Sequence, residues 1–290
     1  MNPKKWIPWQ AKIAAKIGLS RLPIPYRFWR AISCFDLGPM EEPDYALRVF
    51  REHWTRARPR PAADRFACLE LGPGNTLFTA LIAPAFGFTE TLLVDAGAFA
   101  ADDLSPYRKM AARLAADGLP APALDGCRTL TDVLRTTGAR YRTAGLASLK
   151  ELPPQSVHFA FSQAVLEHVR RGEFEPTMRE LSRILHRDGV ASHRVDLTDH
   201  LNGRLDNLRF STRRWESNLF AKSGFYTNRL RLSEIVAACD SADLSVEVSG
   251  IERWESPPTP RAKLAAPFSG LPDSDLTVSA FDLVMRPRRL

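Results

Sequence analysis

Cysteine is rare in this chain, and its few copies form no pattern. The four cysteines lie far apart along 290 residues, and no Cys-x-x-Cys pair occurs. Zinc sites and thiol–disulfide motifs use closely spaced cysteines, so the sequence predicts neither. Isolated cysteines are typical of a reducing compartment, and we therefore expect a cytoplasmic protein.

Long hydrophobic runs are also missing. No apolar stretch approaches the roughly 20 residues that a transmembrane helix needs. The basic start of the chain contains Pro8, Lys12 and Lys16, which interrupt the apolar centre of any signal peptide. With 44% hydrophobic residues, the chain is long enough for one sizeable core with an appendage.

Acidic residues are absent from the first 35 positions. Seven of the 40 basic residues lie there, and the other 33 are balanced by 33 acidic residues. The net charge of +7 therefore belongs to one segment, which argues against a general nucleic-acid-binding surface. Residues 1–35 also carry Trp6 and Trp9. A basic amphipathic helix with interfacial tryptophans can lie on an anionic membrane. The alternative is a cap helix that packs on the rest of the protein.

The strongest signal lies between Cys68 and Gly97. An apolar strand runs from Cys68 into the turn Gly72-Pro73-Gly74, and a second apolar strand ends in Asp95. Glycines let a backbone approach a ligand where a Cβ would clash. A carboxylate at the tip of the second strand can accept hydrogen bonds from both ribose hydroxyls. The pattern indicates an α/β sheet that binds an adenosine-containing cofactor.

Two details of this turn distinguish between cofactors. The dinucleotide fingerprint reads Gly-x-Gly-x-x-Gly, but Leu77 stands where its third glycine would be. Glu70, two residues before Gly72, would repel a pyrophosphate, whereas S-adenosylmethionine (SAM) carries an ammonium and a sulfonium. The sequence therefore predicts SAM rather than NAD.

At these residues the chain resembles the class I SAM-dependent methyltransferases. The resemblance implies that Glu70, Gly72 and Gly74 line the methionine end of SAM and that Asp95 holds the ribose. It places further cofactor contacts at Asn75, Ala96, Gly145, Leu146, Ser162 and Gln163.

The chain departs from the family pattern at three places. Thr76 replaces a frequent third glycine, and His158 replaces an aspartate on the fourth strand. No acid occurs among residues 145–147, where an aspartate commonly contacts adenine. For His158 we expect a local hydrogen bond rather than catalysis.

Alternation of strands and helices predicts a doubly wound, seven-stranded, mostly parallel sheet of the Rossmann-like methyltransferase type. The expected strands are Phe66–Leu71, Thr91–Asp95, a short one at Tyr141, Ser156–Ser162, Val190–Leu197, Leu244–Ile251 and Leu276–Met285. The expected helices are Pro43–Trp54, Thr76–Ala85, Pro106–Asp117, one within 118–138, Glu173–Leu185, Arg213–Ser223 and Ser233–Ala238. We assign residues 1–60 to an N-terminal helical segment and 61–290 to the methyltransferase domain, with an inserted lid at 198–240.

Methyl transfer to a hydroxyl needs a base, and histidine is suited to that task because its pKa lies near neutrality. His193 and Asp196 stand at the end of the fifth expected strand, and His168 follows the fourth. We favour His193 as general base with Asp196 orienting it or binding the substrate. His168 is the second choice. The alternative is that His193 is a buried core residue and Asp199 a helix cap.

A divalent metal is a further possibility at the same strand end. Asp196, Asp199 and His200 offer two carboxylates and one imidazole, which would suit magnesium or manganese. Acids at the start of a loop are more often caps or substrate contacts, so we do not favour the metal.

Three further segments are residues 25–29 (PYRFW), residues 192–200 (SHRVDLTDH), and residues 208–211 (LRFS) through 228–231 (NRLR). With these segments the whole chain resembles bacterial methyltransferases of envelope polysaccharide assembly. The similarity implies O-methylation of a sugar or another polar metabolite. The expected lid is rich in side chains that hydrogen-bond or stack on sugars, namely Arg209, Trp215, Asn218, Tyr226, Asn228 and Arg231. One alternative is a lipid-linked or quinone-like acceptor at the inner membrane surface, reached through residues 1–35. Another is a non-catalytic SAM-binding protein.

Overall fold

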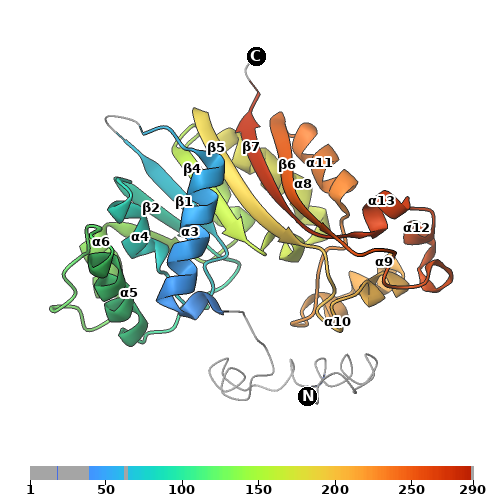
Figure 1. Cartoon of the computed structure of the whole chain (residues 1–290), viewed down its shortest axis with the longest axis horizontal. Helices are drawn as coiled ribbons and strands as arrows, with labels where there is room; N and C mark the ends of the chain where they lie inside the picture. The colour runs from blue at the N-terminus through green and yellow to red at the C-terminus, as the bar shows by residue number, and fades with distance from the viewer. Residues whose placement is uncertain (1–17, 19–38, 62–64, 289–290) are drawn as a thin grey trace.

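A computed structural model describes residues 39–61 and 65–288, together with Gly18. The expected amphipathic stretch at 1–35 therefore lies almost wholly outside the described residues. The centre of the molecule is a seven-stranded sheet in the order β3-β2-β1-β4-β5-β7-β6 (Figure 1). The strands are β1 Ala67–Leu71, β2 Glu90–Val94, β3 Ala139–Arg142, β4 Val157–Gln163, β5 Leu185–Asp196, β6 Leu244–Arg253 and β7 Val278–Pro287.

The direction of the strands confirms the predicted fold class. Strands β1 to β5 pair in parallel, whereas β7 lies antiparallel between β5 and β6. An all-parallel dinucleotide-binding sheet has no such reversed strand. The central strands β1 and β4 are buried along nearly their whole length, as expected for a sheet that is covered on both faces.

Helices cover both faces of this sheet. One layer holds α3 Pro43–Ala57, α4 Thr79–Ala85, α5 Ser105–Ala116 and α6 Leu130–Thr137, whose apolar residues form one core with one face of the sheet. The other layer holds α7 Leu146–Lys150, α8 Arg171–Ile184 and α11 Leu232–Asp240, which share a second core with the opposite face. Within the described part of the chain, no helix is long and apolar enough to cross a membrane.

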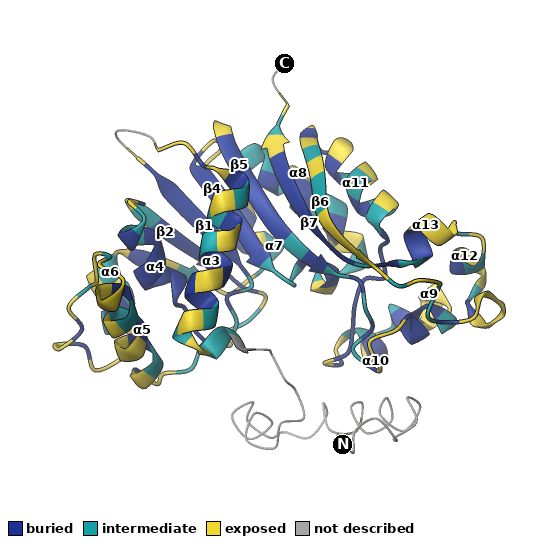
Figure 2. Ribbon diagram, in the orientation of Figure 1, coloured by how far each residue is buried: buried dark blue, intermediate teal, exposed yellow. Residues whose placement is uncertain are grey.

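Helix α3 lies across one face of the sheet (Figures 1 and 2). Phe50 on this helix packs edge to face against Phe159 and Phe161 of β4, at ring-centroid distances of 6.0 and 5.4 Å. Its apolar stripe is thus part of the main core, although the sequence analysis assigned it to the N-terminal segment. The helix ends at Arg58, which adopts a left-handed conformation with φ 48°.

The lid differs from its sequence-based description in three ways. Helix α11 packs on α8 and β6 and therefore belongs to the sheet layer. The expected helix over 213–223 is two short ones, α9 Thr212–Trp215 and α10 Asn218–Ala221.

The third difference is a second lid segment that precedes β7. Its Leu264, Phe268 and Leu276 form a common core with Leu205 and Leu208. The short helices of the two segments are η4 Asp206–Arg209, η5 Arg261–Lys263, α12 Ala266–Ser269 and α13 Asp273–Leu276. The remaining short helices are η2 Pro39–Glu41 and η3 Leu166–His168.

Strand β5 also begins earlier than predicted. Residues Arg187-Asp188-Gly189, which precede the expected strand Val190–Leu197, lie within β5. The register between β5 and β4 shifts between Val157 and Phe159, so residues 187–189 lie in an irregular part of β5. A Cβ on Gly189 would lie 2.9 Å from the carbonyl oxygens of His186 and Val157, which explains why glycine occupies this position.

Candidate functional site

The glycine turn leaves β1 at the carboxyl edge of the parallel strands. Gly72 and Gly74 have φ of 65° and 70°, a region that is costly for residues with a Cβ. The Gly72 N–H donates to the Val94 carbonyl at 2.8 Å. A Cβ on Gly72 would lie 2.6 Å from Val165, whereas one on Gly74 would meet nothing within 4 Å. Gly72 is therefore needed for packing, and Gly74 leaves open space beside the turn.

Asp95 is held beside this turn. The backbone N–H of Gly74 donates to its Oδ2 at 3.0 Å, and that of Ala96 donates to its Oδ1 at 2.7 Å. Burial raises the pKa of Asp95, and these two hydrogen bonds oppose the rise. The Gly145 N–H donates to the Asp95 carbonyl oxygen at 2.8 Å. The structure thus brings together Gly72, Gly74, Asp95, Ala96 and Gly145 as the sequence analysis expected.

Asn75 points in a different direction from the expected cofactor. Its Nδ2 donates to Glu41 at 2.7 Å, and the Thr76 hydroxyl donates to the Met40 carbonyl at 3.1 Å. Both contacts hold helix η2 against the glycine turn. Thr76, which stands where the resemblance led us to expect a glycine, therefore binds the segment that precedes α3.

Glu70 is not at the open edge. Its side chain is 4% exposed, it accepts a hydrogen bond from Thr79, and burial raises its pKa to about 8. The adjoining cavity, lined in part by Met40 and Phe161, measures only ≈ 10 Å³. Such a group is largely protonated at pH 7, so the argument that its negative charge selects a cationic ligand does not hold for this geometry.

The tip of β4 presents one of its two expected contacts. Gln163, the last residue of β4, is half-buried at the carboxyl edge. Ser162 is fully buried, and its hydroxyl lies 2.7 Å from His193 Nδ1 on the other face of the sheet. Successive side chains of a strand point to opposite faces, which separates these neighbours.

His193 does not have the surroundings of a general base. Its side chain is 0% exposed, and burial, together with the charge of His53, lowers its pKa to about 3. Nδ1 contacts Ser162, and Nε2 is buried without a hydrogen-bond partner in the described ranges. Asp196 accepts from the Thr198 N–H at 2.8 Å and is not in contact with His193. The alternative reading of His193 as a buried core residue agrees with this structure.

His168 and His200 form an accessible pair at the same edge. Their Nε2 atoms lie 3.1 Å apart, and the rings stack with centroids 4.8 Å apart at an angle of 12°. His168 Nδ1 lies 2.9 Å from the Tyr226 carbonyl oxygen, so it must be the protonated nitrogen. His168 Nε2 is then an acceptor, and His200 donates to it. In neutral His200 the lone pair is consequently on Nδ1.

Surrounding protein atoms and the facing His200 ring lower the pKa of His168 to about 4, although its side chain remains accessible to solvent. It is therefore neutral at pH 7, as the proton arrangement above requires. The sequence analysis named His168 as a second choice and considered His200 only as a metal ligand. The structure brings the two rings together.

The acids near His200 organise backbone rather than a metal site. Asp199 is 2% exposed and accepts from the N–H groups of Leu201, Asn202 and Asp206 at 2.6–3.0 Å. Leu201 and Asn202 lie in a turn, so Asp199 holds a loop and is not the helix cap of the alternative. No group of three or more His, Cys, Asp or Glu side chains is placed to hold a metal ion in the residues that the structure describes.

Most of the lid residues expected to bind a sugar are buried instead. Trp215 is 0% exposed, and its Nε1 donates to the Thr227 carbonyl at 2.7 Å. Arg231 is 1% exposed and donates to the carbonyl oxygens of Leu197, Asp275 and Val278.

Tyr226 and Asn228 are buried as well. The Asn228 amide donates to Leu166 and Val169 at 2.8 and 3.0 Å and so ties the lid to η3. Of the six expected lid contacts, only Arg209 and Asn218 keep accessible surface. The sequence-based role of the other four in sugar binding is therefore corrected to a structural one.

His158 lies at the opposite edge of the sheet, near the start of β4. Its Nδ1 accepts from the Ala67 N–H at 3.2 Å, and its ring stacks on His186 at 4.7 Å. The predicted local hydrogen bond is thus present.

Comparisons with known proteins find matches among solved structures only. No protein-family profile matches the chain, and no curated protein matches its sequence. Among solved structures, the CurJ carbon methyltransferase matches with 12% identity and a TM-score of 0.43 over 86% of this chain, which spans about half (54%) of that one.

Two further structures match over most of both chains. An S-adenosylmethionine-dependent methyltransferase from Mesorhizobium loti has 18% identity and a TM-score of 0.42, covering 83% of this chain and 96% of its own. Geranyl diphosphate C-methyltransferase from Streptomyces coelicolor A3(2) has 14% identity and a TM-score of 0.45, covering 84% and 79%. At these identities and TM-scores the likeness carries no argument about function.

Proposed function

We propose that this chain is a SAM-dependent methyltransferase. The observation that carries the proposal is the glycine turn with Asp95 fixed beside it, in a sheet whose β7 runs antiparallel. Helix α4 begins at Thr79, five residues after Gly74, so its N-terminus is not at the turn where a dinucleotide pyrophosphate would bind. A cofactor without phosphate agrees with this arrangement.

The strand order gives the cofactor a direction along the carboxyl edge. Gly145 and Leu146 follow β3, Asp95 follows β2, and the glycine turn follows β1. These strands are neighbours in the order β3-β2-β1. In this proposal adenine lies near Gly145, the ribose is bound by Asp95, and the methionine end crosses the turn toward β4. Ligands of open α/β sheets bind at this edge, where the strand order reverses.

The proposed reaction is O-methylation, with His200 as general base. The hydrogen bond from His200 to His168, and from His168 to the Tyr226 carbonyl, orients the two rings. In this proposal His200 Nδ1 takes the hydroxyl proton. SAM held at this edge would supply the methyl group as a sulfonium, and transfer to the deprotonated oxygen would break its S–CH3 bond and release S-adenosylhomocysteine (SAH). A positioned base of this kind contributes roughly 10²- to 10⁴-fold to the rate.

The proposed acceptor is a hydroxylated polar metabolite such as a glycan. This part of the proposal rests on the similarity of the chain to methyltransferases of polysaccharide assembly and on the accessible imidazole pair. A lipid-linked acceptor depends on residues 1–35, which lie outside the described ranges.

Transfer of tritium from methyl-labelled SAM tests the proposal. Purified protein would be incubated with labelled SAM and a cell extract, unreacted SAM would be removed by cation exchange, and the remaining label would be separated into water-soluble and organic fractions. The proposal predicts label in the water-soluble fraction, which the Asp95→Ala variant fails to produce. Label in the organic fraction would support the lipid-linked acceptor. If the protein binds SAH but transfers no label with extracts of cells grown under several conditions, a non-catalytic SAM-binding protein would be supported.

A further inference from the structure

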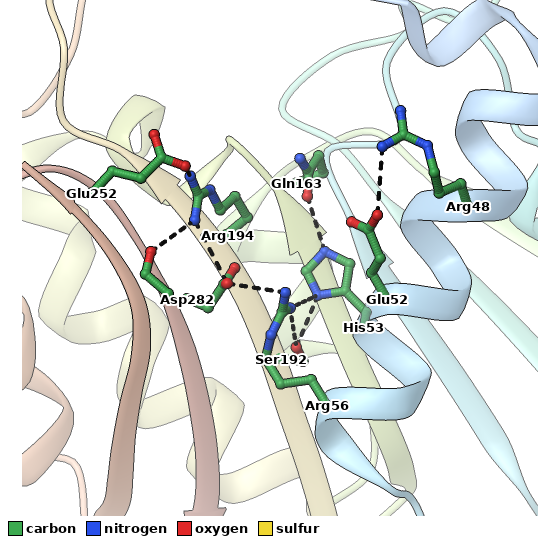
Figure 3. A network of polar contacts seen from close by, with 10 residues as sticks. Arg48, Glu52, His53, Arg56, Gln163, Ser192, Arg194, Glu252 and Asp282 are labelled. Atoms are coloured by element: carbon green, nitrogen blue, oxygen red, sulfur yellow. Dashed lines mark hydrogen bonds and ion pairs between the residues drawn. The ribbon is translucent and has the colours of Figure 1, made fainter.

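His53 connects helix α3 to the neighbouring strands β4 and β5 (Figure 3). Its Nδ1 lies 2.8 Å from the Ser192 hydroxyl, and its Nε2 lies 3.1 Å from Gln163 Oε1. The side chain is 1% exposed, and its ring packs on Phe161 at a centroid distance of 5.3 Å. A buried polar ring with both nitrogens bonded has a fixed orientation.

Arg56 determines which nitrogen of His53 carries the proton. Its Nη1 lies 3.3 Å from His53 Nδ1, and its Nη2 lies 3.0 Å from Asp282 Oδ2. A guanidinium group can only donate hydrogen bonds. Nδ1 is therefore the acceptor, and the N–H of the ring is on Nε2. Burial and the charge of Arg56 lower the pKa of His53 to about 3, so the ring is neutral at physiological pH.

The protonated Nε2 in turn fixes the amide of Gln163. Because Nε2 donates, the atom of Gln163 that faces it must be the oxygen. The amide nitrogen then points away from His53, as Figure 3 shows. It makes no hydrogen bond within residues 39–61 and 65–288. The tip of β4 thus presents two oriented N–H groups at the carboxyl edge.

The position of β4 indicates what these N–H groups meet. β4 adjoins β1 on the side away from β2. With the ribose at Asp95 on β2, a cofactor that crosses the β1 turn brings its methionine end to β4. That end carries a carboxylate, which accepts hydrogen bonds and donates none.

We infer that Gln163 donates its amide N–H to the carboxylate of the methionine end of SAM, and that His53 is the positioning residue that holds the amide in this orientation. The inference rests on the proposed function. The inferred contacts form a network from Asp282 through Arg56 and His53 to the cofactor. No sequence motif indicates this network.

Two ligands test this inference by calorimetry with the full chain. SAH has the amino-acid end, whereas 5′-methylthioadenosine lacks it and keeps the adenosine. Gln163→Glu removes the donors and adds a repelling charge, so it should weaken SAH binding about 10- to 100-fold and leave methylthioadenosine within about twofold. His53→Phe should weaken SAH selectively in the same direction. His53→Gln, whose amide can still donate to Gln163, should restore most of the SAH affinity.

A double variant and a matched control separate positioning from stability. Combined with Gln163→Ala, the His53→Phe change should cause no further loss of SAH affinity, because the amide that it positions is already absent. His158→Phe replaces another buried histidine at the far edge of the sheet and should lower the melting temperature without changing the ratio of the two affinities.

The outcomes distinguish the inference from the proposed function. If the wild-type protein binds neither ligand, the proposed function fails and the inference fails with it. If it binds both, but Gln163→Glu leaves SAH affinity unchanged or weakens both ligands equally, the methionine carboxylate is not bound by Gln163 and the inference alone is overturned. Equal weakening of both ligands by His53→Phe would overturn the positioning role of His53.

Discussion

His168 and His200 share one hydrogen bond between their Nε2 atoms, 3.1 Å apart. His168 ends η3, which follows β4, and His200 lies in the turn that follows β5. The Tyr226 carbonyl sets the proton arrangement of the pair. The relationship resembles that of a base and its orienting group in general acid–base sites. The pair is accessible to solvent, whereas His193 is 0% exposed within the sheet.

The first prediction concerns this pair. His200→Ala should lower kcat for methyl transfer by about 100-fold or more, with SAH affinity unchanged. His168→Ala should have a smaller effect, and His168→Gln should retain more activity because its amide can bond to both Tyr226 and His200. His193→Asn serves as the comparison: it should lower the melting temperature and leave kcat within about threefold. A larger loss of kcat in His193→Asn than in His200→Ala would show that His193, and not His200, is the general base.

The two glycines of the turn should respond differently to alanine. Gly72→Ala combines a left-handed φ with a Cβ 2.6 Å from Val165, so the melting temperature should fall sharply, and Val165→Ala should recover part of the loss. Gly74→Ala meets nothing within 4 Å, so its cost is limited to the backbone strain of about 1–2 kcal/mol. The methyl group would nevertheless occupy the proposed cofactor space. Equal thermal effects, or unchanged SAH affinity in Gly74→Ala, would contradict this account of the turn.

Glu70 makes folding stability depend on pH. Burial raises its pKa from the ordinary value of 4.5 to about 8, so the folded state binds the proton more tightly than the unfolded state. The contribution of this proton to the free energy of unfolding is complete below pH 4.5 and is lost as the pH rises toward 8. The free energy of unfolding then falls by at most ~1.4 kcal/mol per pH unit. Glu70→Gln removes this dependence. The difference in unfolding free energy between variant and wild type, measured by denaturant titration, should therefore grow in favour of the variant from pH 5 to 8. A constant difference across that range would show that Glu70 is not buried as described.

The sheet was predictable because its signals are local. Apolar strands, the glycine turn and the acid at the tip of β2 each occupy a few consecutive residues. The start of β5 was expected at Val190 and lies at Leu185, because the irregular pairing of its first residues with β4 leaves no periodic pattern in the sequence. The division of residues 213–223 into α9 and α10 likewise depends on packing around Trp215.

The side-chain geometry of the site depends on contacts between distant positions. Alternation along β5 shows that His193 and Asp196 point to opposite faces, but it does not show which face is covered. His53 lies on a correctly predicted helix, yet its partner Gln163 is 110 positions away, and no periodic pattern connects them. The second lid segment was missed because it lies next to residues 205–208 only after β6 and β7 have paired. For His200 the signal was its position just after a strand end, which the sequence analysis used for a metal site alone.

Calorimetric titration of the wild-type protein and of the Asp95→Ala variant, each with SAH and with NAD⁺, tests most directly whether the glycine turn binds SAM. We expect the wild-type protein to bind SAH and not to bind NAD⁺. We expect Asp95→Ala to weaken SAH binding by about 10-fold or more, because hydrogen bonds to a charged group contribute about 1.5–3 kcal/mol. Absence of SAH binding by the wild-type protein, or equal SAH affinity in the two proteins, would contradict SAM binding at this turn.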